Sequence, residues 1–159
     1  MTTLLEFMTA AHRRCDEALA AAEGEVCGKN WGAAAQKYQE FNAAMACHFA
    51  QEEDVLFPAF EEATGMTEGP TAVMRMEHEQ MRSLLAQLAS AAGEQDSSRF
   101  LGLSETLMIL IQQHNMKEEQ MLYPMCDQRL EEIDALIGRI EAVGSDSGLR
   151  SPKPEEGAP

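Results

Sequence analysis

Residues 48–58 read HFAQEEDVLFP, and residues 114–124 read HNMKEEQMLYP. The two stretches align at an offset of 66 residues (114 − 48) and share a histidine, two successive glutamates, a leucine and a proline, with an aromatic residue before the proline. The same offset maps His12 onto His78, so all four histidines of the chain belong to one repeat. Self-similarity at a fixed offset indicates two copies of one supersecondary unit.

Apolar periodicity alone does not account for this repeat. Two helical hairpins of similar length need similar apolar stripes, which would explain the repeated leucines and methionines. A shared need for apolar stripes would not explain a histidine and a glutamate in the middle of an apolar face, because burying either residue is costly unless it is paired or metal-bound. The repeat therefore points to a binding site as well as to a fold.

The rest of the chain is predicted to form helices separated by glycine and proline. Apolar residues recur with the period of a helix, and no segment alternates convincingly with the period of a strand. Pro58 and Pro124 should kink or end their helices, because proline lacks a backbone donor and clashes with the preceding turn. The predicted helices span about residues 3–22, 31–58, 71–92, 98–123 and, in a shorter segment, 127–143.

Four long helices joined by short loops favour an all-α fold, an antiparallel up-down four-helix bundle with a short extra C-terminal helix. A length of 159 residues with 45% hydrophobic residues suits one domain, which we place at residues 1–143. The remaining segment, residues 144–159, has almost nothing to bury and is predicted to be a disordered tail.

Charge and cysteine content narrow the partners and the compartment. Lys and Arg total 12 against 27 Asp and Glu, and the net charge of −15 repels phosphate backbones and anionic lipid, so neither nucleic acid nor a membrane is expected as a partner. No apolar run approaches the roughly 18 to 20 residues of a membrane span. The four cysteines form no C-x-x-C pair and read as reduced thiols, which favours a cytoplasmic protein.

The repeated His-x-x-x-Glu motif places two ligand types on one helix face. Its two residues lie one turn apart, about 6 Å between Cβ atoms, so both side chains reach the same point inside a bundle. Two such motifs, with one histidine from each remaining helix, bring four imidazoles and two carboxylates together. Each carboxylate can bridge two cations, so the symmetry predicts two metal ions. The predicted ligands are His12, His48, Glu52, His78, His114 and Glu118.

Mixed imidazole and carboxylate ligation without thiolate favours iron first, and manganese or zinc after it, whereas four histidines exclude an all-oxygen calcium site. Glu53 and Glu119 point about 100° away from the ligands and are expected to be solvated or to contact them from outside. Asp16 could orient an imidazole or form a surface salt bridge, since its repeat partner is Arg82. For Tyr123, the sequence gives no reason to prefer a hydrogen bond over packing.

These motifs resemble those of the hemerythrin-like, or HHE cation-binding, domain over about residues 3–125. The resemblance implies a non-haem di-iron centre with an oxo or hydroxo bridge and two bridging carboxylates. It implies that one iron is held by His12 and His48 and the other by His78 and His114, with Glu52 and Glu118 as the bridges.

One position departs from the oxygen-carrying members of that family. They have a fifth histidine one turn before the histidine of the third helix, and this chain has Met74 there. One iron should therefore lose a ligand. An extra open position suits the binding or reduction of O2, peroxide or nitric oxide better than clean reversible carriage of O2.

Three functions are compatible with this interpretation. The first is a di-iron protein that binds O2 or a related diatomic ligand in sensing or stress response, with an unidentified electron donor. The second is a di-iron oxidoreductase, such as a peroxidase, an oxidase, a nitric oxide reductase or an iron-centre repair protein. The third is a metal store, which the absence of the Glu-x-x-His motif of ferritin-like bundles disfavours.

Overall fold

The computed structural model describes residues 2–146, and among these residues it contains helices and no strand. The prediction of an all-α bundle is confirmed. The first three residues of the predicted disordered tail, 144–146, belong to the last helix, and the rest of it, from residue 147 onward, lies outside the described residues. The helices are α1 (Leu4–Cys27), α2 (Trp31–Gln51), α3 (Phe57–Thr64), α4 (Pro70–Gly93), α5 (Ser97–Lys117), α6 (Tyr123–Arg129) and α7 (Ile133–Asp146).

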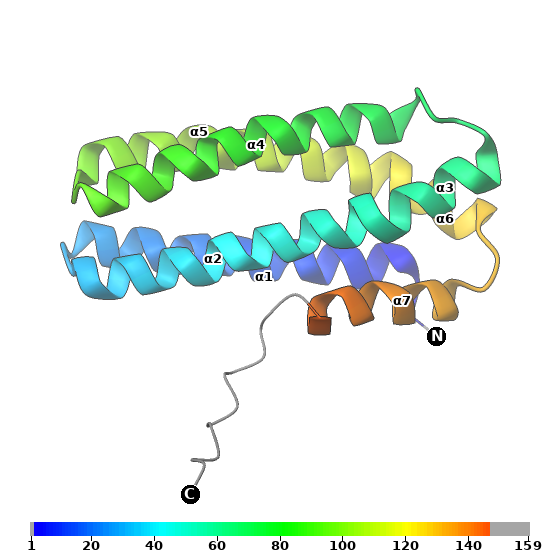
Figure 1. Cartoon of the computed structure of the whole chain (residues 1–159), viewed down its shortest axis with the longest axis horizontal. Helices are drawn as coiled ribbons and strands as arrows, with labels where there is room; N and C mark the ends of the chain where they lie inside the picture. The colour runs from blue at the N-terminus through cyan, green and yellow to red at the C-terminus, as the bar shows by residue number, and fades with distance from the viewer. Residues whose placement is uncertain (1, 147–159) are drawn as a thin grey trace, which may run out of the picture.

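The four long helices lie side by side along one axis, and α7 runs alongside α1 and α2 near the end that holds the N-terminus (Figure 1). Helix α1 contacts α2 and α5, and α4 contacts the same two helices, so the four surround a common interior. The fifth predicted helix begins later than expected, at Ile133, because Asp127 still belongs to α6. None of the helices in the described part of the chain is long and apolar enough to cross a membrane.

The start of α1 is fixed by two sets of hydrogen bonds. The Thr3 hydroxyl accepts from the backbone N–H of Glu6, and the Glu6 carboxylate accepts from the N–H of Thr3, forming a capping box. Asp127 accepts from the N–H groups of Leu4 and Leu5 at 2.9 and 3.1 Å. The Asp127 bonds connect α6, in the second half of the repeat, to the start of α1, in the first half.

The prediction that helices end at Pro58 and Pro124 is wrong. A π-helical segment, η1 (Glu52–Leu56) or η2 (Glu118–Leu122), precedes each proline, and the helix continues beyond it. A π turn is wider than an α turn, because each N–H bonds to the carbonyl five residues earlier. The widened turn accommodates the proline ring, so the second and fourth helices extend to Thr64 and Arg129.

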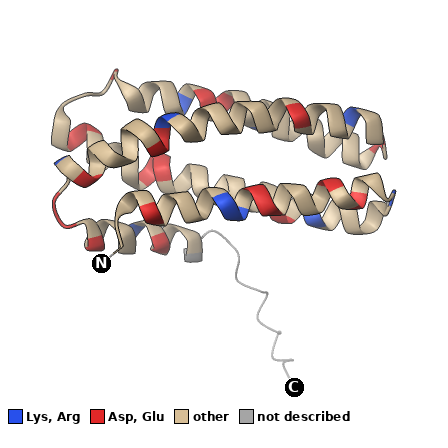
Figure 2. Cartoon of the chain, turned by 180° about the vertical axis from the view of Figure 1, so that it is seen from behind, with Lys and Arg blue, Asp and Glu red and all other residues tan. Residues whose placement is uncertain are grey.

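Two apolar clusters fill the interior, one on each side of the predicted ligands. The cluster toward the α1–α2 and α4–α5 turns contains Leu19, Phe41, Leu88, Phe100 and Leu107 among its fully buried members. The cluster under α7 contains Leu4, Met8, Leu56, Phe60 and Ile140. Acidic residues are distributed along the helices of both halves (Figure 2).

Candidate metal centre

All six predicted ligands lie inside the bundle, although four of them are ionisable imidazoles and two are carboxylic acids. None of the six is more than 5% exposed. Each of the helices α1, α2, α4 and α5 contributes one histidine, and each π-helical segment begins with one glutamate. Such groups are buried at a high cost in free energy unless each finds a partner.

Each glutamate contacts one histidine from each half of the repeat. Oε1 of Glu52 lies 3.2 Å from Nε2 of both His48 and His78. Oε1 of Glu118 lies 3.2 Å from Nε2 of His12 and 3.1 Å from Nε2 of His114. Both carboxylates are therefore placed between the two halves, as a pair of bridging ligands requires.

The ligand atoms fall into two overlapping groups, each with its atoms within 4.8 Å of one another. The first group is His12, His48 and Glu118, and the second is Glu52, His78, His114 and Glu118. The histidines pair in these groups as the family resemblance implies, and Glu118 belongs to both. Two cation positions that share a carboxylate would have this arrangement.

The contacts between these atoms fit cation ligation better than hydrogen bonding. Several buried atoms lack any hydrogen-bond partner in the described chain, although they approach one another within 3.2 Å in pairs: Glu52 Oε1 with His78 Nε2, and Glu118 Oε1 with His114 Nε2. Two ligands at about 2.1 Å from one ion and at right angles are about 3.0 Å apart. The observed spacing is close to that value, so the residues present fit a pair of metal ions.

Carboxylates also contact the outer nitrogens of three histidines. Glu53 Oε2 lies 2.6 Å from Nδ1 of His78, and Glu119 Oε2 lies 3.4 Å from Nδ1 of His12. Both glutamates thus contact predicted ligands from outside, which was one of the two expected outcomes. A carboxylate at this nitrogen fixes the ring and makes the inner nitrogen a better donor to a metal.

Sequence reasoning missed the third contact. Glu77 Oε1 lies 2.9 Å from Nδ1 of His114, and Lys117 also binds Glu77. The repeat maps Glu77 onto Ala11, so the internal comparison gave no signal for it. The fourth histidine differs, because Nδ1 of His48 has neither a hydrogen-bond partner nor a carboxylate contact like those of the other three among residues 2–146. The two halves of the centre are therefore unequal.

The two central carboxylates have opposite pKa shifts. Burial raises the pKa of Glu118 to about 8, and the charge of neighbouring Glu52 adds to the increase. Burial also opposes ionisation of Glu52, but the charge of His48 and hydrogen bonds from its neighbours bring its pKa well below the usual value. Two carboxylates this close repel each other when both are ionised, and cations between them would remove that repulsion.

Tyr123 is a further polar group of the centre. Its buried hydroxyl donates to Oε2 of Glu52 at 2.9 Å and lies 3.1 Å from Nε2 of His12. In an α-helix Tyr123 would lie about 140° around the axis from Glu118. Instead the Tyr123 N–H bonds to the carbonyl of Glu118 across the π turn, which brings the two side chains to one face. The sequence alone does not reveal this turn.

Aromatic rings cover one side of the centre. Phe57, the repeat partner of Tyr123, stacks on His78 with ring centroids 5.6 Å apart, and Phe49 stacks on the same imidazole at 4.2 Å. Met74 is 3% exposed and belongs to the apolar cluster under α7 that also contains Tyr123. It lies one turn before His78 on α4, as the sequence requires.

Comparison with known families agrees with the geometry. Residues 3–126 match the hemerythrin HHE cation binding domain. The chain belongs to this family. Comparison with curated proteins and with solved structures gave no match. As a hemerythrin domain, the chain has a cluster of buried histidines and glutamates that could hold metal cations.

Proposed function

We propose that this hemerythrin domain is a non-haem di-iron protein that binds O2 or a related small diatomic ligand. In this proposal an antiparallel up-down four-helix bundle holds two iron ions with a bridging oxo or hydroxo group. The observation that supports it best is that each of two buried carboxylates contacts a histidine of both halves. Nitrogen and oxygen ligands without thiolate suit iron, with manganese or zinc as less favoured alternatives.

The ligand sets follow from the contacts. His12 and His48 would hold one ion, His78 and His114 would hold the other, and Glu52 and Glu118 would bridge them. Two such ions supply a place for a diatomic ligand to bind and electrons for its reduction. The protein supplies burial, which excludes bulk water, and outer carboxylates that keep three imidazoles oriented.

The size of the ligand is limited by a nearly enclosed cavity beside the centre. Its walls include His12 and His48 together with the apolar side chains of Met45, Met81 and Ile111. The cavity has a volume of about 10 Å³, which is about the space that one water-sized molecule needs. Its small size and mainly apolar walls favour a small neutral ligand such as O2 or nitric oxide over a larger substrate.

An oxidoreductase is the second candidate, because Tyr123 places a proton at the centre. The hydroxyl donates to Glu52 and faces the His12 nitrogen, and burial raises the Tyr123 pKa well above its usual value, so the proton is retained. A peroxidase, an oxidase or a nitric oxide reductase would use such a proton. Met74, in place of a fifth histidine, is consistent with turnover and leaves a position for a substrate such as peroxide.

Anaerobic reduction followed by addition of O2 distinguishes the two candidates. A long-lived coloured adduct that returns to the ferrous state under vacuum supports ligand binding, in a sensor or a stress protein. Rapid oxidation with consumption of peroxide supports an enzyme. Purified protein that contains only zinc and takes up no iron anaerobically would contradict both.

The four free cysteines, all inside the described range, are consistent with a reducing cytoplasmic setting.

A further inference from the structure

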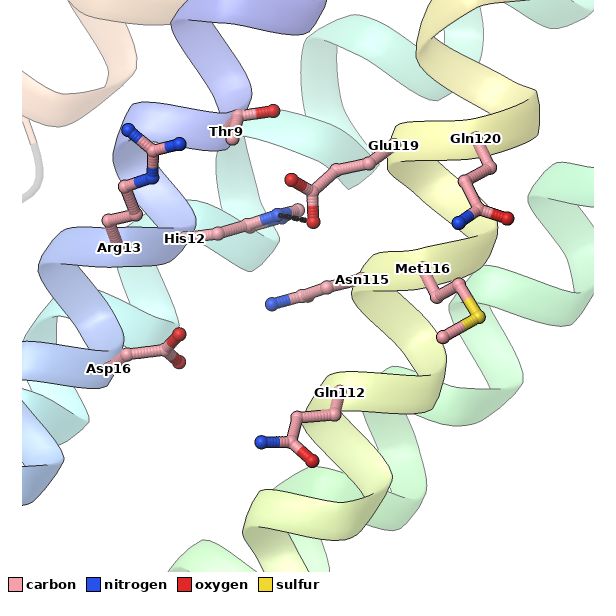
Figure 3. Close-up of a pocket in the computed structure, with 9 residues that line it drawn as sticks. All are labelled: Thr9, His12, Arg13, Asp16, Gln112, Asn115, Met116, Glu119 and Gln120. Atoms are coloured by element: carbon pink, nitrogen blue, oxygen red, sulfur yellow. Dashed lines mark ion pairs between the residues drawn. The ribbon is translucent and has the colours of Figure 1, made fainter.

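An open pocket leads from the surface to the centre on its His12 side. It lies between α1 on one side and α5 with η2 on the other, and its volume is about 410 Å³. Figure 3 shows His12 and Glu119 meeting at the inner end, with the carboxylate of Asp16 and the amides of Gln112 and Asn115 directed into the space. A cation with six waters, at about 30 Å³ each, would occupy roughly 180 Å³ and would fit.

The corresponding place in the other half of the repeat is closed. There Phe49 stacks on His78 with centroids 4.2 Å apart, and the Arg82 guanidinium lies over the Phe49 ring at 5.1 Å. Arg82 also donates to both oxygens of Glu53 at 3.0 and 2.8 Å. An apolar ring and a positive charge therefore cover the imidazole.

Two differences between the repeats explain the opening at His12. Offsets of 66 residues map Phe49 onto Asn115 (115 − 49) and Arg82 onto Asp16 (82 − 16). The ring is thus replaced by a small amide, and the cation by an anion. The same offset pairs Glu53 with Glu119. Glu53 binds the Arg82 guanidinium, whereas Glu119 lines a pocket that also contains the Asp16 carboxylate.

Two buried atoms of this pocket make no hydrogen bond, although one of them, Nδ1 of His12, lies 3.4 Å from Oε2 of Glu119. Oδ1 of Asp16 and Nδ1 of His12 are both inaccessible and have no hydrogen-bond partner in the described chain, and His12 is only 4% exposed. Arg13 also lines the pocket, but in Figure 3 its guanidinium points away from Asp16. Asp16 and Glu119 both line this pocket, and their two negative charges attract a cation.

We propose that this pocket is the route by which divalent metal ions reach the centre, with Asp16 and Glu119 attracting the ion on its way to His12. The proposal rests on the proposed function, since it presupposes that the centre holds metal. The approach to His114 is also blocked by a positive charge, which supports this choice of route. Lys117 binds Glu77, and Glu77 contacts His114 from outside, so an incoming metal ion would meet the Lys117 ammonium there.

The rate at which metal-free protein takes up Co²⁺, followed by cobalt absorbance after rapid mixing, tests the route. Asp16→Arg recreates the charge of the closed side and should slow uptake by about tenfold or more, since steering by charge changes association rates about 10- to 1,000-fold. Asp16→Asn should give an intermediate rate. Both variants should reach the wild-type cobalt content and spectrum, because Asp16 is not a ligand.

Glu62→Arg is the matched control, because it makes the same charge change at an exposed residue of α3. It should load like the wild type. Uptake by Asp16→Arg at the wild-type rate, or equal slowing by Glu62→Arg, overturns the route. If Asp16→Arg does not fold, the salt dependence of the Co²⁺ uptake rate tests the route instead. Added salt should slow uptake by the wild type more than uptake by Asp16→Asn, and equal slowing overturns the route. A wild type that takes up no cobalt would instead contradict the proposed function.

Discussion

The hydroxyl of Tyr123 donates to Oε2 of Glu52 at 2.9 Å, and the two residues come from different halves of the repeat. The equivalent aromatic residue in the other half is Phe57, which has no hydroxyl, so this hydrogen bond makes the two halves of the candidate metal centre unequal. The contact also fixes one oxygen of a proposed bridging carboxylate.

Tyr123→Phe should change the optical spectrum of the iron-loaded protein and lower its melting temperature. The variant leaves a buried carboxylate oxygen without its donor, and a hydrogen bond to a charged group contributes about 1.5 to 3 kcal/mol. Tyr38→Phe is the control, because the buried hydroxyl of Tyr38 donates to the Leu85 carbonyl inside the apolar cluster away from α7. It should lower the melting temperature and leave the spectrum unchanged. Identical spectra for wild type and Tyr123→Phe would show that Tyr123 does not affect the metals.

Glu77→Gln should weaken metal binding about 10- to 100-fold, measured by competition with a chelator. The carboxylate lies 2.9 Å from Nδ1 of His114, and loss of such an outer partner reduces metal affinity by this factor. The amide is similar in size, so the fold should be kept. Glu62→Gln, on the exposed face of α3, should bind metal as tightly as the wild type. Unchanged affinity in Glu77→Gln would mean that the contact does not tune the ligand.

Met74→His should slow oxidation of the ferrous protein and shift its spectrum. The new imidazole would lie one turn before His78 on a buried face of α4, where it can add a ligand to an ion. Met8→His is the matched control, because Met8 is the repeat partner of Met74 and is also buried under α7. If both variants or neither shift the spectrum, position 74 has no special relation to the metals.

Cys15 and Cys126 should resist thiol reagents in the folded protein. Burial, aided by nearby acidic groups, raises the pKa of each thiol to about 12, so only about one in 10,000 molecules carries the reactive thiolate at pH 8. Exposed Cys27 should react quickly. Because the thiolate fraction rises with pH below the pKa, modification of the two buried thiols should still be accelerating at pH 10. Mass mapping that finds Cys15 or Cys126 labelled first would contradict the burial.

The sequence predicted the all-α fold and the convergence of six side chains, because a repeat that places histidine and glutamate on apolar faces leaves few arrangements. It did not predict that the helices continue past Pro58 and Pro124, since the π turns that accommodate proline have no simple sequence signal. The inward position of Tyr123 depends on the same turn. The contact of Glu77 with His114 could not be predicted, because the two residues lie 37 positions apart and the repeat partner of Glu77 is not acidic.

The metal content of the protein after anaerobic iron loading tests the central claim most directly. The proposed ligand sets predict two iron ions per chain in the wild type. They predict one or none in Glu118→Ala, with a lower melting temperature, because this carboxylate belongs to both ligand groups. Two tightly held ions in Glu118→Ala, or none in the wild type, would contradict a carboxylate-bridged pair.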